Sequence, residues 1–245
     1  MPTWAIYLIV ALGACGAGAI QTACGFGAGV VLLLVLSRFL DMLSAPAVNL
    51  LICVFLTLSL SWRYRKQIQF GTILIPLIPY LVSSTLINLV VDRMDLGLLG
   101  VLFGVFQLAL CAYYLLVARR LGTRTSTVAG ILCGFFSGIT ASLFGVGGPL
   151  LAVFLLGACP TKESYTGSMQ FVLFLTNLII FSGKLLSGFF ALSMLPMALA
   201  GILGVLAGQW CGERLTRRWD AERMKTVVYI FIGVSGLVTV LQYAL

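Results

Sequence analysis

A cluster of glycines interrupts a long apolar stretch in each half of the chain. The clusters are Cys24-Gly25-Phe26-Gly27-Ala28-Gly29, within the stretch 4–36, and Phe144-Gly145-Val146-Gly147-Gly148-Pro149, within the stretch 127–157. An unbroken helix of either length would be about 50 Å long, whereas the hydrocarbon core of a bilayer is about 30 Å thick. Glycine weakens a helix, and proline fits best in its first turn. We therefore predict that each stretch is a helix, a break and a second half-helix, with Pro149 near the start of the later half-helix.

Six further apolar stretches have the length of a membrane span. They are bounded by charges and turn residues, at 42–62, 69–91, 96–118, 164–183, 189–211 and 226–244. About 20 apolar residues are enough to cross a bilayer. Of the 245 residues, 61% are hydrophobic and 9% are charged, whereas roughly a quarter are charged in a soluble domain. The composition predicts an all-α polytopic protein embedded in the lipid bilayer, and it excludes a disordered chain.

The basic residues favour a topology in which both long stretches fold back at their glycines. If all eight stretches crossed once, the loop Lys and Arg residues would split 7 against 8, whereas folding both back gives 12 against 3. Cytoplasmic loops carry the basic excess in membrane proteins. Folding back only 127–157 gives the same count, so the similar glycine cluster is what favours a fold-back in the first stretch. The predicted location is the inner (cytoplasmic) membrane, with both termini outside. The basic residues punctuate apolar runs and form no basic face, so we expect no nucleic-acid partner.

Residues 1–118 and 128–245 are predicted to form two inverted repeats, joined by a basic cytoplasmic linker at 119–127 within one integral domain. Each repeat would hold one broken helix and three transmembrane helices. Six residues recur 120 positions later in the same order: Gly18, Gly25, Gly27, Ser44, Phe70 and Pro76 match Gly138, Gly145, Gly147, Ser164, Phe190 and Pro196. Inverted repeats with interrupted helices are typical of secondary transporters, and the interruptions mark the site.

The predicted binding site lies at the two helix breaks, which we expect to meet near the membrane midplane. The N–H groups that open a half-helix have no helical partner, carry the positive end of the helix dipole and suit an anion. An alternative role for the glycines is close helix packing, and for the polar side chains it is hydrogen bonding between helices. The candidate substrate-binding residues are Gln21, Thr22, Cys24, Gly25, Gly27, Gly29, Asn49, Thr140, Ser142, Gly145, Gly147, Gly148, Ser168 and Gln170.

The absence of some residue types restricts the chemistry. The chain has no histidine, which excludes a His-ligated metal site and a Ser-His-Asp triad. Its seven cysteines show no CxxC spacing. We therefore expect no catalytic residue, no metal and no cofactor, and hence not an enzyme. The Asp and Glu residues, Glu213 included, fall in loops or at span ends, so if protons are the coupling ion, the substrate or a span-end group would carry them.

The second half contains two motifs that decide a family resemblance. They are Thr140-Ala141-Ser142-Leu143-Phe144-Gly145-Val146-Gly147-Gly148-Pro149-Leu150-Leu151 and Tyr165-Thr166-Gly167-Ser168-Met169. These motifs, with the two-half layout of nearly the whole chain, resemble the TauE/SafE family of membrane anion transporters. In that family a small-hydroxyl motif follows each glycine-rich motif, whereas the first half here has Val48-Asn49-Leu50 at that place.

The resemblance implies a small sulfur-containing oxyanion as the substrate, such as sulfite or an organosulfonate like sulfoacetate. The predicted function is secondary transport of this anion by alternating access, with the anion held at the ends of the broken helices. Two alternatives are a passive anion channel of the same fold and a transporter of a non-sulfur organic anion.

Overall fold

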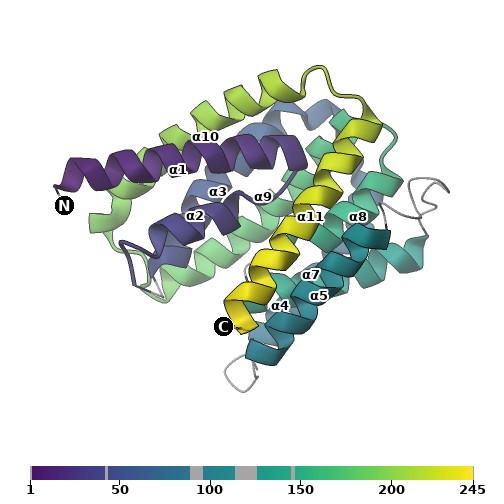
Figure 1. Cartoon of the computed structure of the whole chain (residues 1–245), viewed down its shortest axis with the longest axis horizontal. Coiled ribbons are helices and arrows are strands. Elements are labelled where there is room, and N and C mark those ends of the chain that lie inside the picture. The colour runs from purple at the N-terminus through teal and green to yellow at the C-terminus, as the bar shows by residue number, and fades with distance from the viewer. Residues whose placement is uncertain (1, 42–43, 89–95, 114–125, 145–146, 245) are drawn as a thin grey trace. The chain divides into compact units, whose positions relative to one another are not determined.

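The structure, a computed structural model, describes residues 2–41, 44–88, 96–113, 126–144 and 147–244. All regular secondary structure in these ranges is helical (Figure 1). The chain divides into two compact units, which are described separately below. Unit 1 comprises Met1–Ile68 and Glu163–Trp219, and unit 2 comprises Gln69–Lys162 and Asp220–Leu245. Each unit therefore takes helices from both halves of the chain.

Unit 1 is built around five α-helices. They are α1 (Thr3–Cys24), α2 (Ala28–Leu36), α3 (Ser44–Arg63), α9 (Lys162–Leu186) and α10 (Leu195–Thr216), with two 3-10 helices, η1 (Arg65–Gln67) and η4 (Leu192–Met194). Helix α1 packs along α10, and α3 packs against both α2 and α10. Their apolar faces form a common core in which Leu32, Ile52 and Leu56 are fully buried.

The first long stretch breaks at its glycine cluster, as predicted. Helix α1 ends at Cys24 and α2 begins at Ala28, and between them Gly25 and Gly27 have φ angles of 88° and 109°. Glycine adopts such positive φ values without steric cost. Helix α2 folds back along α1. The contact that shows this is between Gly13 and Val35: a Cβ added to Gly13 would lie 2.9 Å from the side chain of Val35. Since its 9 residues rise only about 14 Å, α2 returns partway and cannot cross a bilayer.

This first break lies at the end of a full-length helix. Helix α1 has 22 residues and is therefore about 33 Å long, which is close to the thickness of a hydrocarbon core. The glycines follow a helix that is long enough to cross the bilayer by itself.

Small residues let α1 and α10 approach closely. Gly204, Gly208 and Gly212 recur at every fourth position of α10 and face α1. A Cβ on Gly208 would overlap the carbonyl oxygen of Cys15, so the two backbones are in contact there. Such contacts drive helix association in membranes. Close packing is thus the role of these glycines, which lie outside the two predicted clusters.

Unit 2 contains the second long stretch. Its helices are α4 (Phe70–Asn88), α5 (Leu96–Tyr113), α7 (Thr127–Phe144), α8 (Gly148–Ala158) and α11 (Ala221–Ala244). Helix α4 packs along α7, and α5 packs along α11. Pro149 lies in the first turn of α8, as predicted. Helix α8 folds back on α7. The contact that shows this is between Gly130 and Phe154: a Cβ added to Gly130 would lie 2.7 Å from the ring of Phe154.

The helices have the length and surface of membrane spans. Among the described residues, five are long and apolar enough to cross a bilayer: Thr3–Cys24, Ser44–Arg63, Phe70–Ile87, Lys162–Leu186 and Leu192–Thr216. Large apolar side chains on them point outwards, as Trp4 and Leu203 do with exposed fractions of 69% and 71%. Exposing so many apolar side chains to water would be unfavourable, whereas lipid tails surround them without this cost.

Helix α10 extends further than the sequence predicts. The expected span ended at residue 211, but the helix continues to Thr216 and includes Glu213. The carboxylate of Glu213 pairs with the guanidinium of Arg63 at 3.0 Å. This partner neutralises a charge that otherwise marks the end of an apolar span, so Glu213 belongs to the helix and not to a loop.

Candidate functional site

Two glutamine side chains, 149 residues apart in sequence, hold the first helix break. Nε2 of Gln21, in the last turn of α1, donates to Oε1 of Gln170 on α9 at 3.0 Å. Oε1 of Gln21 accepts the backbone N–H of Ala28, the first residue of α2, at 3.1 Å. Nε2 of Gln170 donates to the carbonyl oxygen of Gly25 at 2.8 Å. The two amides thus bind one donor and one acceptor that the interrupted helix leaves unpaired.

Tyr165 adds a third contact that sequence reasoning missed. Its hydroxyl donates to the carbonyl oxygen of Cys24 at 2.7 Å, and the side chain is 1% exposed. A Cβ on Gly25 would lie 2.7 Å from the same hydroxyl oxygen. A tyrosine within an apolar helix needs a partner for its hydroxyl, and this was the available signal. Tyr165 and Gln170 together make α9 the support of the break.

Asn49 joins α3 to the start of α2. Its Nδ2 donates to the carbonyl oxygen of Gly29 at 3.1 Å, and its Oδ1 accepts the thiol of Cys53 at 3.6 Å. A Cβ on Gly29 would lie 3.5 Å from Asn49 Nδ2, which is an ordinary contact. Asn49 therefore faces the protein interior and contacts the second residue of α2, next to the break.

The other candidates of unit 1 are Thr22, Cys24, Gly27 and Ser168. Thr22 donates to the carbonyl oxygen of Gly18 at 2.7 Å, so its hydroxyl is bonded within α1. Cys24 is 3% exposed and Ser168 is fully buried. Gly27 caps the start of α2. Unit 1 thus brings together Gln21, Thr22, Cys24, Gly25, Gly27, Gly29, Asn49 and Gln170 around one interruption.

Unit 2 holds the remaining candidates around the start of α8. Gly148 opens the helix and Gly147 precedes it, while Gly145 lies outside the described residues. A Cβ on Gly147 would lie 2.7 Å from the hydroxyl of Tyr80 and 2.9 Å from the carbonyl oxygen of Ser137. This crowding shows why the position is a glycine. Thr140 donates to that same carbonyl oxygen of Ser137 at 3.2 Å.

Two serines complete the surroundings of α8. Ser142 donates to the carbonyl oxygen of Ser84 on α4 at 3.0 Å, and so ties α7 to α4. Ser137, which the sequence analysis did not single out, is fully buried, and its Oγ has no hydrogen-bond partner within the part of the chain that the structure describes. A serine one turn before Thr140 on an apolar helix was the available signal for it.

The amide pair at the first break has a testable energetic consequence. Replacing Gln21 by Leu leaves Gln170 Oε1 and the N–H of Ala28 buried without partners. Each orphaned polar group costs about 1–3 kcal/mol, so we expect a clear loss of thermal stability in detergent. Gln170→Leu should act similarly. The loss of stability in the double variant should be smaller than the sum of the two single losses, because in the double variant neither glutamine remains as a buried amide without its partner.

Gln67→Leu, at an exposed position of η1, is the matched control and should leave stability unchanged. Additive effects of Gln21→Leu and Gln170→Leu, within about 0.5 kcal/mol, would show that the two amides do not interact.

Comparison with known proteins assigns the chain to a family. The family model described as Sulfite exporter TauE/SafE matches residues 9–239. Searches among curated proteins and among solved structures each returned no significant match. The match covers the helices of both units, including both interrupted helices. With its apolar spans and its two helix breaks, the chain is a multi-pass membrane protein that belongs to the TauE/SafE sulfite exporter family, a family of membrane transporters.

Proposed function

We propose that this protein is a secondary transporter that moves sulfite or an organosulfonate such as sulfoacetate by alternating access. The observation that carries the proposal is the break between α1 and α2, where side chains of α9 hold the carbonyl oxygens of Cys24 and Gly25. The first turn of α2 then presents backbone N–H groups, including those of Gly29 and Val30, that no helix start can pair internally. Together with the helix dipole they favour an anion.

The two breaks differ in the polar groups around them, and we propose that they contribute differently to anion binding. The amides of Gln21, Asn49 and Gln170 all lie in unit 1, whereas hydroxyls and glycines surround α8 in unit 2. Amide N–H groups are hydrogen-bond donors suited to an oxyanion, and glycines allow a ligand to approach the backbone. We propose that the unit 1 residues, including Ser168, bind the anion at the first break, and that Thr140, Ser142, Gly147 and Gly148 of unit 2 bind it at the second.

An inverted repeat is part of the proposal. With the 120-residue offset, α1 corresponds to α7 and α10 corresponds to α4. Helix α1 packs on α10 in unit 1, and α7 packs on α4 in unit 2, as expected if the two units are built alike from exchanged helices. Since α2 and α8 both fold back on the preceding helix, the likeness extends to the interrupted helices. This supports repeats at 1–118 and 128–245.

The charges of unit 1 support the proposed orientation. Arg63 at the end of α3 pairs with Glu213 near the end of α10, so these two helix ends, with their basic residues, lie together. Gly167 of α9 contacts Tyr64 at this same end, and Lys184 lies about 25 Å further along α9. We therefore propose that the Arg63 end faces the cytoplasm of a cell with an inner membrane and that both chain termini lie outside.

The proposal is tested by a binding screen on purified protein. Sulfite, sulfate, sulfoacetate, taurine and ethanesulfonate are compared with propionate, a carboxylate of similar size, and with chloride. We expect sulfite or a sulfonate to bind most tightly, because its three oxygens can accept several N–H groups at once. The proposal fails if none binds more tightly than chloride, and tighter binding of propionate would favour a non-sulfur organic anion.

Transport measurements separate a carrier from a channel. In proteoliposomes, we expect saturable exchange of labelled sulfite against unlabelled sulfite. Resolvable single-channel currents without such exchange would identify a passive anion channel of the same fold. Uptake that follows an imposed pH gradient would identify protons as the coupling ion.

A further inference from the structure

The last turns of α10 contain a carboxylate held as a bound oxyanion would be held. We propose that Arg63 and Gln209 form an oxyanion site, that Glu213 of the protein itself occupies it, and that the transported sulfite or sulfonate competes with this carboxylate for Arg63. The inference rests on the proposed function and deepens it, since it assigns the place where the anion is received at one end of unit 1.

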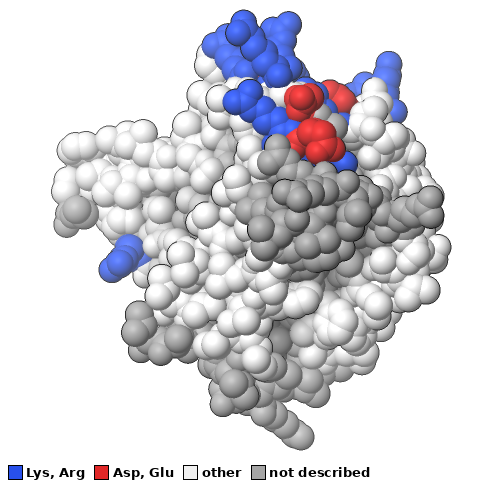
Figure 2. Space-filling model, turned by 45° about the vertical axis from the view of Figure 1, so that its right-hand side comes forward, with Lys and Arg blue, Asp and Glu red and all other residues white. Residues whose placement is uncertain are grey.

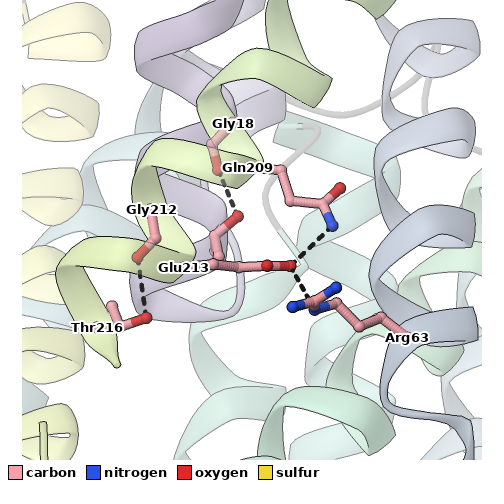
Figure 3. Close-up of polar contacts among 7 residues, drawn as sticks. Gly18, Arg63, Gln209, Gly212, Glu213 and Thr216 are labelled. Atoms are coloured by element: carbon pink, nitrogen blue, oxygen red, sulfur yellow. Dashed lines mark hydrogen bonds and ion pairs between the residues drawn. The ribbon is translucent and has the colours of Figure 1, made fainter. Parts of the chain in front are cut away.

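One oxygen of Glu213 receives two donors from different helices. Nε of Arg63, at the end of α3, lies 3.0 Å from Oε1 of Glu213. Nε2 of Gln209, one turn earlier on α10, donates to the same oxygen at 3.0 Å. Figure 3 shows both side chains directed at this carboxylate. A guanidinium and an amide N–H converging on one anionic oxygen are the donors that recognise carboxylates, sulfonates and sulfite.

The burial of these groups shows that the site is built into the helix packing. The side chain of Glu213 is 15% exposed, and Gln209 is 8% exposed. Oε1 of Gln209 is buried without a hydrogen-bond partner among the described residues, whereas Nε2 of the same amide donates to Glu213. Arg63, with a side chain 61% exposed, is the component that an anion from solution reaches first.

The site lies beside the first helix break. Gly212, the neighbour of Glu213 in sequence, packs against α1, where its Cβ would lie 2.8 Å from the Cβ of Thr22. Thr22 is three residues before Gly25, and both belong to unit 1. The end of α10 that carries Glu213 is therefore packed against the end of α1 that precedes the break.

The neighbouring basic residues are placed differently from Arg63. Arg65 stacks over the ring of Trp62 at 4.6 Å, and Arg214 stacks over the ring of Trp210 at 3.4 Å. Those arginines lie along the exposed faces of their own helices and raise the local positive potential, which attracts anions. Figure 2 shows Lys and Arg gathered next to Asp and Glu on one part of the face in view. Arg63 alone, among the arginines of α3 and α10, is paired with Glu213.

Tyr64 lies close to the Arg63–Glu213 pair and to Glu163. Burial raises the pKa of Tyr64, the charges of Glu213 and Glu163 raise it further, and Arg63 lowers it. Tyr64 therefore stays neutral near pH 7, and Glu163, at the start of α9, adds negative charge. Since Arg63 is held by Glu213, a substrate anion that binds this guanidinium must displace the Glu213 carboxylate.

The exchange conserves charge. In the resting state Arg63 and Glu213 sum to zero. When a monovalent oxyanion takes the place of the carboxylate on Arg63, the new pair again sums to zero, and the displaced carboxylate turns toward solvent. The negative charge of Glu213 opposes the entry of the oxyanion, so removing that charge should strengthen binding.

The direction in which one substitution changes the affinity for a sulfonate tests the inference. Glu213→Gln keeps the shape but removes the competing charge, so we expect binding of ethanesulfonate, measured by titration calorimetry at pH 7.5, to tighten by about tenfold. A purely structural ion pair predicts the reverse, because its loss would loosen α3 against α10 and weaken binding. Glu222→Gln is the matched control: Glu222 pairs with Lys225 at 3.3 Å and is 67% exposed, so its loss should not change affinity.

A second variant tests the role of the guanidinium. Arg63→Gln should weaken ethanesulfonate binding in both the wild-type and the Glu213→Gln backgrounds, because in both the guanidinium holds the sulfonate. Unchanged or weaker binding by Glu213→Gln, or unchanged binding by Arg63→Gln, would overturn the inference, while sulfonate binding itself leaves the proposed function standing. A wild type that binds no sulfonate would instead refute the proposed function.

Discussion

Gly25→Ala is expected to reduce transport by at least tenfold and to lower stability. Gly25 has a φ of 88°, a left-handed conformation that costs a residue with a Cβ about 1–2 kcal/mol. The new methyl group would also lie 2.7 Å from the hydroxyl of Tyr165 and displace it from the Cys24 carbonyl, orphaning two buried groups at about 1–3 kcal/mol. Because about 1.4 kcal/mol corresponds to a factor of ten, initial rates of sulfite exchange in proteoliposomes should show the loss clearly.

Gly16→Ala is the matched control for this prediction. Gly16 lies on the same helix, and a Cβ there would meet nothing within 4 Å. Alanine is a better helix former than glycine, so this variant should be as stable as the wild type or more stable, and it should transport normally. A Gly25→Ala protein with wild-type exchange rates would show that the break does not require its left-handed glycine, and the anion site would have to lie elsewhere.

Gly208→Leu should prevent most of the protein from folding. Gly208 is buried, and any Cβ there would overlap the carbonyl oxygen of Cys15 on α1. A leucine must push α1 and α10 apart, and overpacking of this kind costs about 1–3 kcal/mol or more. Since close contact of small residues is the main attraction between membrane helices, we expect a large fall in the monodisperse fraction on size-exclusion chromatography and a lower unfolding temperature.

Gly183→Leu makes the same change where space is open. A Cβ on Gly183 of α9 would meet nothing within 4 Å, and the residue is exposed. This variant should behave as the wild type in both measurements. Equal damage by the two substitutions would mean that added leucine, and not the α1–α10 contact, is the cause.

Local properties of the sequence were enough to predict the elements of the fold. Hydropathy and length placed the apolar spans, because a bilayer imposes one thickness on every crossing helix. Gly25 and Gly27 marked the first break because only glycine adopts their positive φ values without cost. Pro149 marked the start of α8 because its ring suits a first helical turn.

The candidate site was predictable in composition but not in arrangement. The sequence placed Gln21 and Gln170 among the candidates because a buried amide in hydrocarbon needs a partner, but their mutual bond spans 149 positions. No local pattern predicts such a pairing. Tyr165 was missed for the same reason, since its partner is a backbone carbonyl on another helix. Helix α10 was drawn too short because a charge usually ends a span, and Arg63 was not yet known to neutralise Glu213.

By itself, then, the sequence determined which segments are apolar helices and where glycine interrupts them, since these properties depend on a residue and its near neighbours. Only the tertiary structure decided that α1 packs on α10 and α4 on α7, and that the first break follows a helix of 22 residues. It also decided which amides and carboxylates form hydrogen bonds or ion pairs with other protein groups. The physical reason is that a polar group inside apolar surroundings must be paired, and the partner is chosen by which helices pack together, not by distance along the chain.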